Sequence, residues 1–159
     1  MDNTQWIDLF RRALRSMDDR LGQVVQLNDC REHWIQAEIS LYAWYHERVE
    51  IWTGGRIGQG RKVDLYHAND DGSMSMIAEI KCLGDASQAK CLDGDWSVAN
   101  DVERLRSVTD VPAKFFILVI PQPGDRRTAV GDELRTREWH SGGIDLELDS
   151  GMARIWEVH

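Results

Sequence analysis

The chain has 159 residues, with 19 lysines and arginines against 27 aspartates and glutamates, so its formal net charge is −8 at pH 7. Hydrophobic residues make up 42% and charged residues 29%, values close to the globular average that exclude collagen-like, disordered and disulfide-scaffold classes. The acidic balance also counts against tight, nonspecific nucleic-acid binding, which depends on lysine and arginine.

The length predicts a single domain over 1–159. The N-terminal sequence has no signal-peptide pattern, and no apolar run is long enough to span a membrane, so we expect a cytoplasmic protein without membrane contact. The three cysteines, Cys30, Cys82 and Cys91, have no metal-ligand spacing and are expected to be reduced thiols.

Two helices are predicted before the first strand. Apolar residues recur at intervals of three and four over 3–21, and Gly22 ends this helix. Asn28 or Asp29 can cap a second helix that reaches about Arg48. The aromatic residues of this second helix are interpreted as core packing rather than as a base-stacking surface: Trp34, Tyr42, Trp44 and Tyr45.

A β-hairpin is predicted in the middle of the chain. Residues 49–52 form a short strand candidate, and the glycine-rich segment 53–61 is expected to be irregular. Residues 62–67 and 74–82 have strand character, and the turn-forming residues 69–72 separate them.

The second half of the chain predicts one more helix and three more strands. Residues 84–95 are expected to form a loop, 97–108 a helix and 114–120 a buried strand. Two further strands are expected over 144–148 and 153–158. The order α-α-β-β-β-α-β-β-β predicts an α/β (α+β) fold with a central mixed sheet flanked by helices.

Charged residues gather on the predicted hairpin. Side chains two apart share one face of a strand, so Glu79 and Lys81 point together, away from Ile80. Across the hairpin, Asp64 is expected to lie near Glu79. Two carboxylates and an ammonium group in an otherwise apolar strand pair suit Mg²⁺ or Mn²⁺, which prefer hard oxygen ligands and open positions for water. The alternative is an ion pair on a solvated sheet face.

These residues resemble the PD-(D/E)XK nuclease superfamily, which has the restriction-endonuclease-like fold. The resemblance covers residues 30–120 and includes Asp64 in KVDLYH, Glu79 and Lys81 in AEIKC, a helix bearing Glu38, the helix NDVERLRSV and the strand KFFILVI. The proline that precedes the aspartate in the family is Val63 here. Residues 1–27 would then be an N-terminal helix and connector, and 121–159 a C-terminal β extension.

The resemblance implies a role for each matching residue. Asp64 and Glu79 would hold the metal, with the Ile80 backbone carbonyl as a further oxygen ligand. Lys81 would orient or help deprotonate the attacking water and offset phosphate charge, and Glu38 would join through a second metal or a metal-bound water. Hydrolysis of a phosphodiester bond to give a 5′-phosphate would follow.

A basic segment precedes the aspartate. Arg56, Arg61 and Lys62 lie among glycines that allow close approach to a nucleic-acid backbone, although a loop with incidental charge explains them equally well. The charges of the helix 97–108 are interpreted as pairs three residues apart, without a further function.

The sequence therefore favours a magnesium-dependent nuclease acting on DNA. Its specificity would come from a homodimer, from DNA structure or from a partner protein. The alternative is a catalytically inactive, nuclease-like interaction protein, such as an immunity, inhibitor or assembly subunit, whose acidic surface meets a basic partner. A toxin-type nuclease effector is a third hypothesis.

Overall fold

The computed structural model describes residues 1–24, 30–57, 60–83, 97–121 and 142–159. The helical elements are α1 (Asn3–Ser16), α2 (Asp18–Val24), α3 (Arg31–Tyr42), the π-helical turn η1 (Ala43–Glu47) and α4 (Val98–Arg106). The strands are β1 (Trp52–Ile57), β2 (Arg61–Ala68), β3 (Met74–Cys82), β4 (Ala113–Pro121), β5 (Ile144–Leu148) and β6 (Gly151–Glu157). Among the described residues, no helix is long and apolar enough to cross a membrane.

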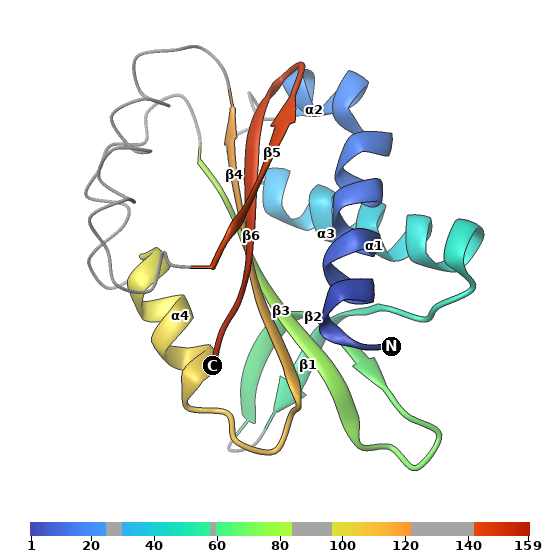
Figure 1. Ribbon diagram of the computed structural model, residues 1–159, viewed down its shortest axis with the longest axis vertical. Helices are drawn as coiled ribbons and strands as arrows, with labels where there is room; N and C mark the ends of the chain where they lie inside the picture. The colour runs from blue at the N-terminus through green and yellow to red at the C-terminus, as the bar shows by residue number, and fades with distance from the viewer. Residues whose placement is uncertain (25–29, 58–59, 84–96, 122–141) are drawn as a thin grey trace.

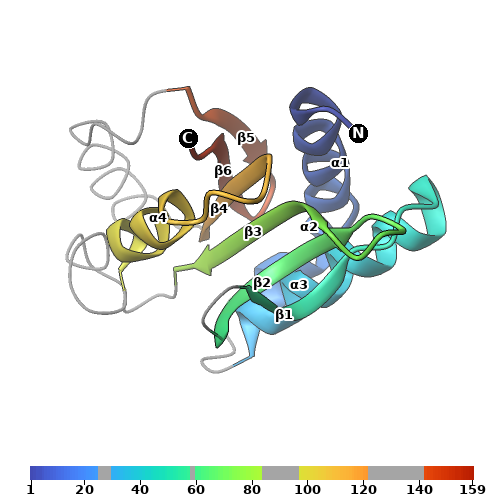
Figure 2. The ribbon, with the colours of Figure 1, turned by 90° about the horizontal axis from the view of Figure 1, so that it is seen from below.

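One six-stranded mixed sheet organises these elements, in the order β1-β2-β3-β4-β6-β5. β3 and β4 are parallel, with α4 in the connection between them, and every other neighbouring pair is antiparallel. Helices α1 to α3 cover one face of the sheet and α4 covers the other (Figures 1 and 2). This confirms the predicted helix-flanked mixed sheet at the level of the α/β class.

Each face of the sheet has its own hydrophobic core. Phe10, Leu14 and Ile39 pack with Ile80 and Ile117 under α1 and α3. On the opposite face, α4 buries its apolar residues against a second group of strand residues: Val98, Val102, Leu105, Ile77, Phe116, Leu118 and Trp156. Alternation along β3 and β4 supplies both cores, which is why residues 114–120 are apolar on both sides.

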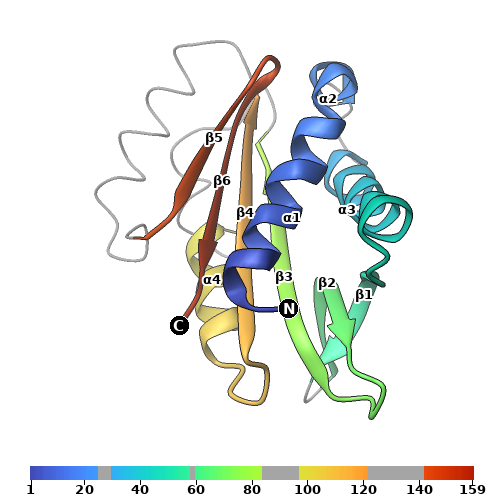
Figure 3. The same cartoon turned by 45° about the vertical axis from the view of Figure 1, so that its right-hand side comes forward.

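The first predicted helix is two helices in the structure. α1 begins with a capping box at Asp2 and ends at Ser16, and Met17 adopts φ −106° and ψ 0° between α1 and α2. The Asp18 carboxylate then accepts hydrogen bonds from the backbone N–H groups of Asp149 and Ser150 in the β5–β6 turn. This contact ties the start of α2 to the far end of the chain, and α2 lies close to the β5–β6 turn (Figure 3).

The prediction of an irregular segment over 53–61 was wrong, because β1 runs from Trp52 to Ile57. Gly54 has φ +69°, which favours glycine, and a Cβ added at Gly55 would lie 2.3 Å from Cδ1 of Tyr66. The glycines therefore allow β1 to lie directly against the Tyr66 ring. The predicted strand at 49–52 overlaps β1 only at Trp52.

The second helix reaches the predicted end near Arg48, but its last turn is π-helical. Trp44 is 47% exposed and Tyr45 is 64% exposed, so the prediction that both belong to the core was wrong. Trp34 and Tyr42 are half-buried against the core, as predicted. Ala43, the first residue of this turn, stays in the core, whereas Trp44 and Tyr45 after it lie at the surface.

The remaining predicted elements agree with the structure where it describes them. The hairpin, the helix starting at Ser97 and the strands β4, β5 and β6 are present at the predicted places. The proposed caps Asn28 and Asp29, the predicted loop 84–95 and Cys91 lie outside the described residues. Cys30 and Cys82 are free thiols, as predicted.

Candidate functional site

Asp64 lies where strands β2 and β3 diverge. Their pairing runs from Ala68–Met74 to Leu65–Ala78, and beyond it the described residues of β2 pair with β1 and those of β3 pair with β4. The freed backbone N–H of Ile80 donates to Oδ2 of Asp64 over 2.8 Å. The half-buried Asp64 carboxylate thus replaces a missing strand partner at the end of the ladder.

Glu79 is the most deeply buried charged group of this region, and its side chain is 4% exposed. Its Oε1 atom accepts from Arg104 of α4, at 2.8 Å from Nη2 and 3.2 Å from Nε. Burial and the nearby Asp64 carboxylate raise the pKa of Glu79 to about 8, although the Arg104 charge opposes this rise. The structure therefore brings Glu79 and Asp64 into electrostatic contact, as the predicted hairpin register required.

Lys81 shares the α4-facing side of β3 with Glu79, which confirms their predicted common face. Its Nζ atom lies 3.6 Å from Oδ2 of Asp101 and 4.0 Å from Oε1 of Glu32. Ile80 points into the opposite core, as predicted, and Cys82 does so too. Lys81 therefore joins a carboxylate of α4 to a carboxylate of α3 at the end of β3.

Two charged residues of α4 complete the group, and the sequence reasoning gave them no function. Asp101 lies between Lys81 and Arg104, with its Oδ1 atom 3.0 Å from Nη2 of Arg104. Burial raises the pKa of Asp101, although both cations oppose that rise. Burial disfavours the charged form of Arg104, yet its contacts with Glu79 and Asp101 raise its pKa overall.

The sequence contains a pattern that could have identified Asp101 as a buried, paired charge. It falls on the buried face of α4 defined by Val98, Val102 and Leu105, where an acidic residue is unexpected unless it is paired.

The structure does not bring Glu38 to this group. Both of its carboxylate oxygens accept from Arg20 of α2 at 2.9 Å, on the outer side of α3. Glu32, on the first turn of α3, is the helix carboxylate that reaches the end of β3. Its Oε1 atom accepts from the backbone N–H of Cys82 at 3.0 Å. Six residues separate the two glutamates, so they lie on different faces of the helix.

The predicted basic residues lie at one end of the β1–β2 hairpin. Arg56 pairs with Lys62 and Ile57 with Arg61, and the side chains of Arg56 and Lys62 are exposed. Lys62 lies two residues before Asp64 on β2. Like charges directly opposite each other destabilise a strand pair.

Asp64 and Glu79 are the two carboxylates of this group that could face a divalent cation in an open site. Among the described residues, the carboxylates of Glu32, Asp64, Glu79 and Asp101 lie with the cations Lys81 and Arg104, and the raised pKa of Glu79 keeps that carboxyl largely protonated at neutral pH. Asp64 and Glu79 would hold the ion, with water in the remaining positions. In the described part of the chain, no three His, Cys, Asp or Glu side chains form a ready-made metal cage.

Comparison with protein-family models, with curated proteins and with solved structures finds no match for this chain.

Proposed function

We propose that this chain is a metal-dependent nuclease with a restriction-endonuclease-like core that hydrolyses phosphodiester bonds in DNA. The observation that carries the proposal is the placement of Asp64 beside Glu79 and Ile80 where β2 and β3 diverge. At such an opening, side chains from two strands can face one ligand without disturbing a continuous ladder. The element order and the parallel β3–β4 pair connected through α4 are compatible with that core.

The group supplies the chemical requirements of phosphodiester hydrolysis. A Mg²⁺ or Mn²⁺ ion held by Asp64, Glu79 and the Ile80 carbonyl would activate water and stabilise charge on the phosphate. The Lys81 ammonium would donate to the attacking water and to a phosphate oxygen. The water oxygen bonds to phosphorus as the bond to O3′ breaks, and the water proton ends on the 3′-hydroxyl, leaving a 5′-phosphate.

The helix carboxylate of the site is Glu32 in this proposal. Glu32 lies near Lys81 and fixes the end of β3 through Cys82, whereas Glu38 is occupied by Arg20. The exposed cations Arg56 and Lys62 would contact the DNA backbone beside Asp64, and Arg61 belongs to the same hairpin end.

A second candidate is a nuclease-like interaction protein without catalytic activity. The contact between Arg104 and Glu79 favours it, because the guanidinium already satisfies a carboxylate oxygen that a metal would need. The net charge of −8 suits a basic partner.

Cleavage of supercoiled plasmid in Mg²⁺ or Mn²⁺ decides between the two. We expect Asp64→Asn, Glu79→Gln and Lys81→Ala to slow nicking by about 100-fold or more, a loss typical of groups that stabilise transition-state charge. Glu103→Gln is the matched control, since Glu103 is an exposed α4 carboxylate paired with Arg106. Full nicking by all three site variants would refute the nuclease site, and no nicking by the wild type would favour the interaction protein.

A further inference from the structure

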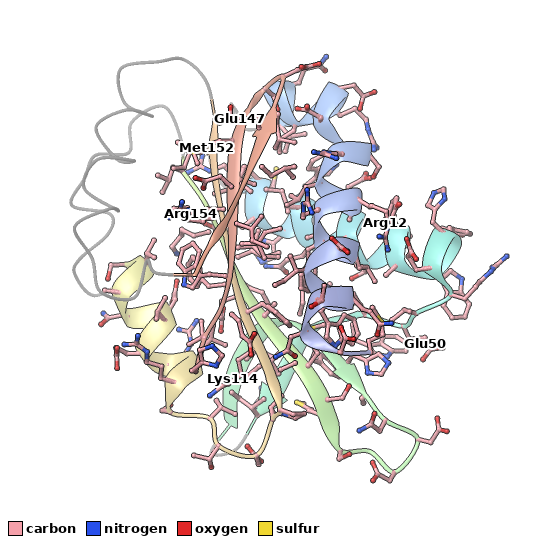
Figure 4. All side chains as sticks on the ribbon, in the orientation of Figure 1. Arg12, Glu50, Lys114, Glu147, Met152 and Arg154 are labelled. Atoms are coloured by element: carbon pink, nitrogen blue, oxygen red, sulfur yellow. The ribbon has the colours of Figure 1, made fainter. Side chains whose placement is uncertain are left out.

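An aromatic pocket lies outside the charged group around Glu79. Trp44 of η1, Glu50 and Ile51 of the following connection, and Trp52 at the start of β1 line a cavity of about 190 Å³. Figure 4 labels Glu50 in this connection, on the side of the molecule away from α4. None of these four residues belongs to the ion-pair group of β3 and α4, so the pocket can be tested separately from the proposed nuclease site.

The surface around the pocket is unusually apolar. Six large hydrophobic side chains are exposed among the described residues, and four of them fall within residues 41–52: Leu41, Trp44, Tyr45 and Trp52. Aromatic residues are enriched in protein interfaces, and a cluster of exposed apolar groups marks an interaction site. A small ligand in the cavity would leave Leu41 and Tyr45 in water, whereas a macromolecule would cover them.

The negative charge of the Glu50 carboxylate makes the pocket more suitable for a cation than for an anion. Glu50 forms no salt bridge with the described residues, although its charge opposes the lowering of the His67 pKa by burial. The nearby Glu47, by contrast, accepts from Nε of Arg12 at 2.8 Å. Indole faces carry negative potential and attract ammonium groups, and a carboxylate beside them strengthens this preference. The same carboxylate repels phosphate, which makes the two tryptophans a poor stacking surface for a nucleic acid.

The backbone at the pocket is held in uncommon conformations. η1 is a π-helical turn, and Arg48, which follows it, has φ 59° without being a glycine. Such features cost on the order of 1–3 kcal/mol and occur preferentially at functional sites. Trp44 lies on this π turn and is 47% exposed.

We propose that this pocket binds a lysine side chain of a basic protein partner. The cavity is smaller than the roughly 300–1,000 Å³ of small-molecule sites, so it suits one side chain rather than a larger ligand. Trp44 and Trp52 would contact the methylene stem and the ammonium group, and Glu50 would pair with its charge. Leu41 and Tyr45, which are exposed close to Trp44 in the chain, would be covered by the partner's surface.

The test follows the indole N–H signals of ¹⁵N-labelled protein as peptides are added. The probe is the blocked tripeptide Ac-Gly-Lys-Gly-NH₂, and the same peptide with norleucine instead of lysine is the uncharged control. We expect the lysine peptide to shift the Trp44 and Trp52 signals selectively. Glu50→Gln should weaken this binding by about fivefold to tenfold, the effect of one desolvated cation contact.

Tyr45→Ala is the matched control variant, because Tyr45 is exposed on the same π turn but does not line the pocket. It should leave binding of the tripeptide unchanged. Three results would overturn the proposal: equal binding of the norleucine peptide, unchanged binding in Glu50→Gln, or no shift of either tryptophan at about 20 mM peptide. Tighter binding of tetramethylammonium would indicate a small free cation instead, and tighter binding of an oligothymidine would indicate a nucleic-acid surface.

Discussion

Replacing Glu79 by glutamine removes the group whose titration is most perturbed by the fold. The pKa of Glu79 is raised from 4.5 to about 8 by burial and by the Asp64 carboxylate. The folded protein therefore retains a proton on Glu79 at pH values where the unfolded chain has lost it. The stability that this retained proton contributes to the folded state is fully present below pH 4.5. It is lost as the pH rises through about 8.

The size of this stability change follows from the difference between the unfolded and the folded pKa of Glu79. Each unit of pKa shift corresponds to about 1.4 kcal/mol, so the whole rise is worth on the order of 4–5 kcal/mol. This is a large fraction of the roughly 5–15 kcal/mol that stabilises a typical domain. The amide of Glu79→Gln mimics the protonated carboxyl and carries no such penalty at high pH.

Urea denaturation of both proteins between pH 4 and pH 9 measures this difference. We expect the free energy of unfolding of the wild type to fall relative to Glu79→Gln as the pH rises, with the steepest change between pH 5 and pH 8. Asp64→Asn should reduce this pH dependence, because the Asp64 charge contributes to the raised pKa of Glu79. A constant difference between the wild type and Glu79→Gln over the whole range would refute this electrostatic description of the site.

Three further substitutions test other parts of the structure. Gly55→Ala should destabilise the protein by about 1–3 kcal/mol in urea denaturation, because its Cβ would meet the Tyr66 ring, and an unchanged midpoint would contradict the contact. Phe116→Ala should cost about 3–5 kcal/mol, since Phe116 is fully buried and its ring lies 4.9 Å from that of Trp156; a loss below about 1 kcal/mol would show that this core is not close-packed. Glu38→Ala should change stability by less than about 1 kcal/mol and leave nicking intact, because Glu38 forms a surface pair with Arg20; loss of nicking would restore Glu38 to the site.

Local patterns in the sequence were sufficient for much of the fold. The continuous apolar run over 114–120 predicts a strand buried on both faces, and β4 is such a strand. Turn residues at 69–72 between two strand-like segments predict the β2–β3 hairpin. The end of α1 was not predictable in this way, because Asp18 is fixed by a turn more than 130 residues away in the chain.

In the candidate site, too, some features were predictable from local sequence patterns and others depend on tertiary packing. The two-residue period of a strand places Glu79 and Lys81 on one face, and the hairpin register brings Asp64 to Glu79. The choice between Glu32 and Glu38 depends on how α3 is rotated against the sheet, which the helix sequence alone does not determine. The apolar pattern of α4 could have identified Asp101 as a buried charge, but its pairing with Lys81 depends on tertiary packing.

Binding of Mg²⁺ and Mn²⁺ to the wild type and to Asp64→Asn, measured by calorimetry on samples also assayed for plasmid nicking, tests the nuclease proposal most directly. The proposal predicts that the wild type binds a divalent cation and nicks DNA, and that Asp64→Asn loses both together. Absence of metal binding by the wild type, or nicking that persists in Asp64→Asn, would contradict it.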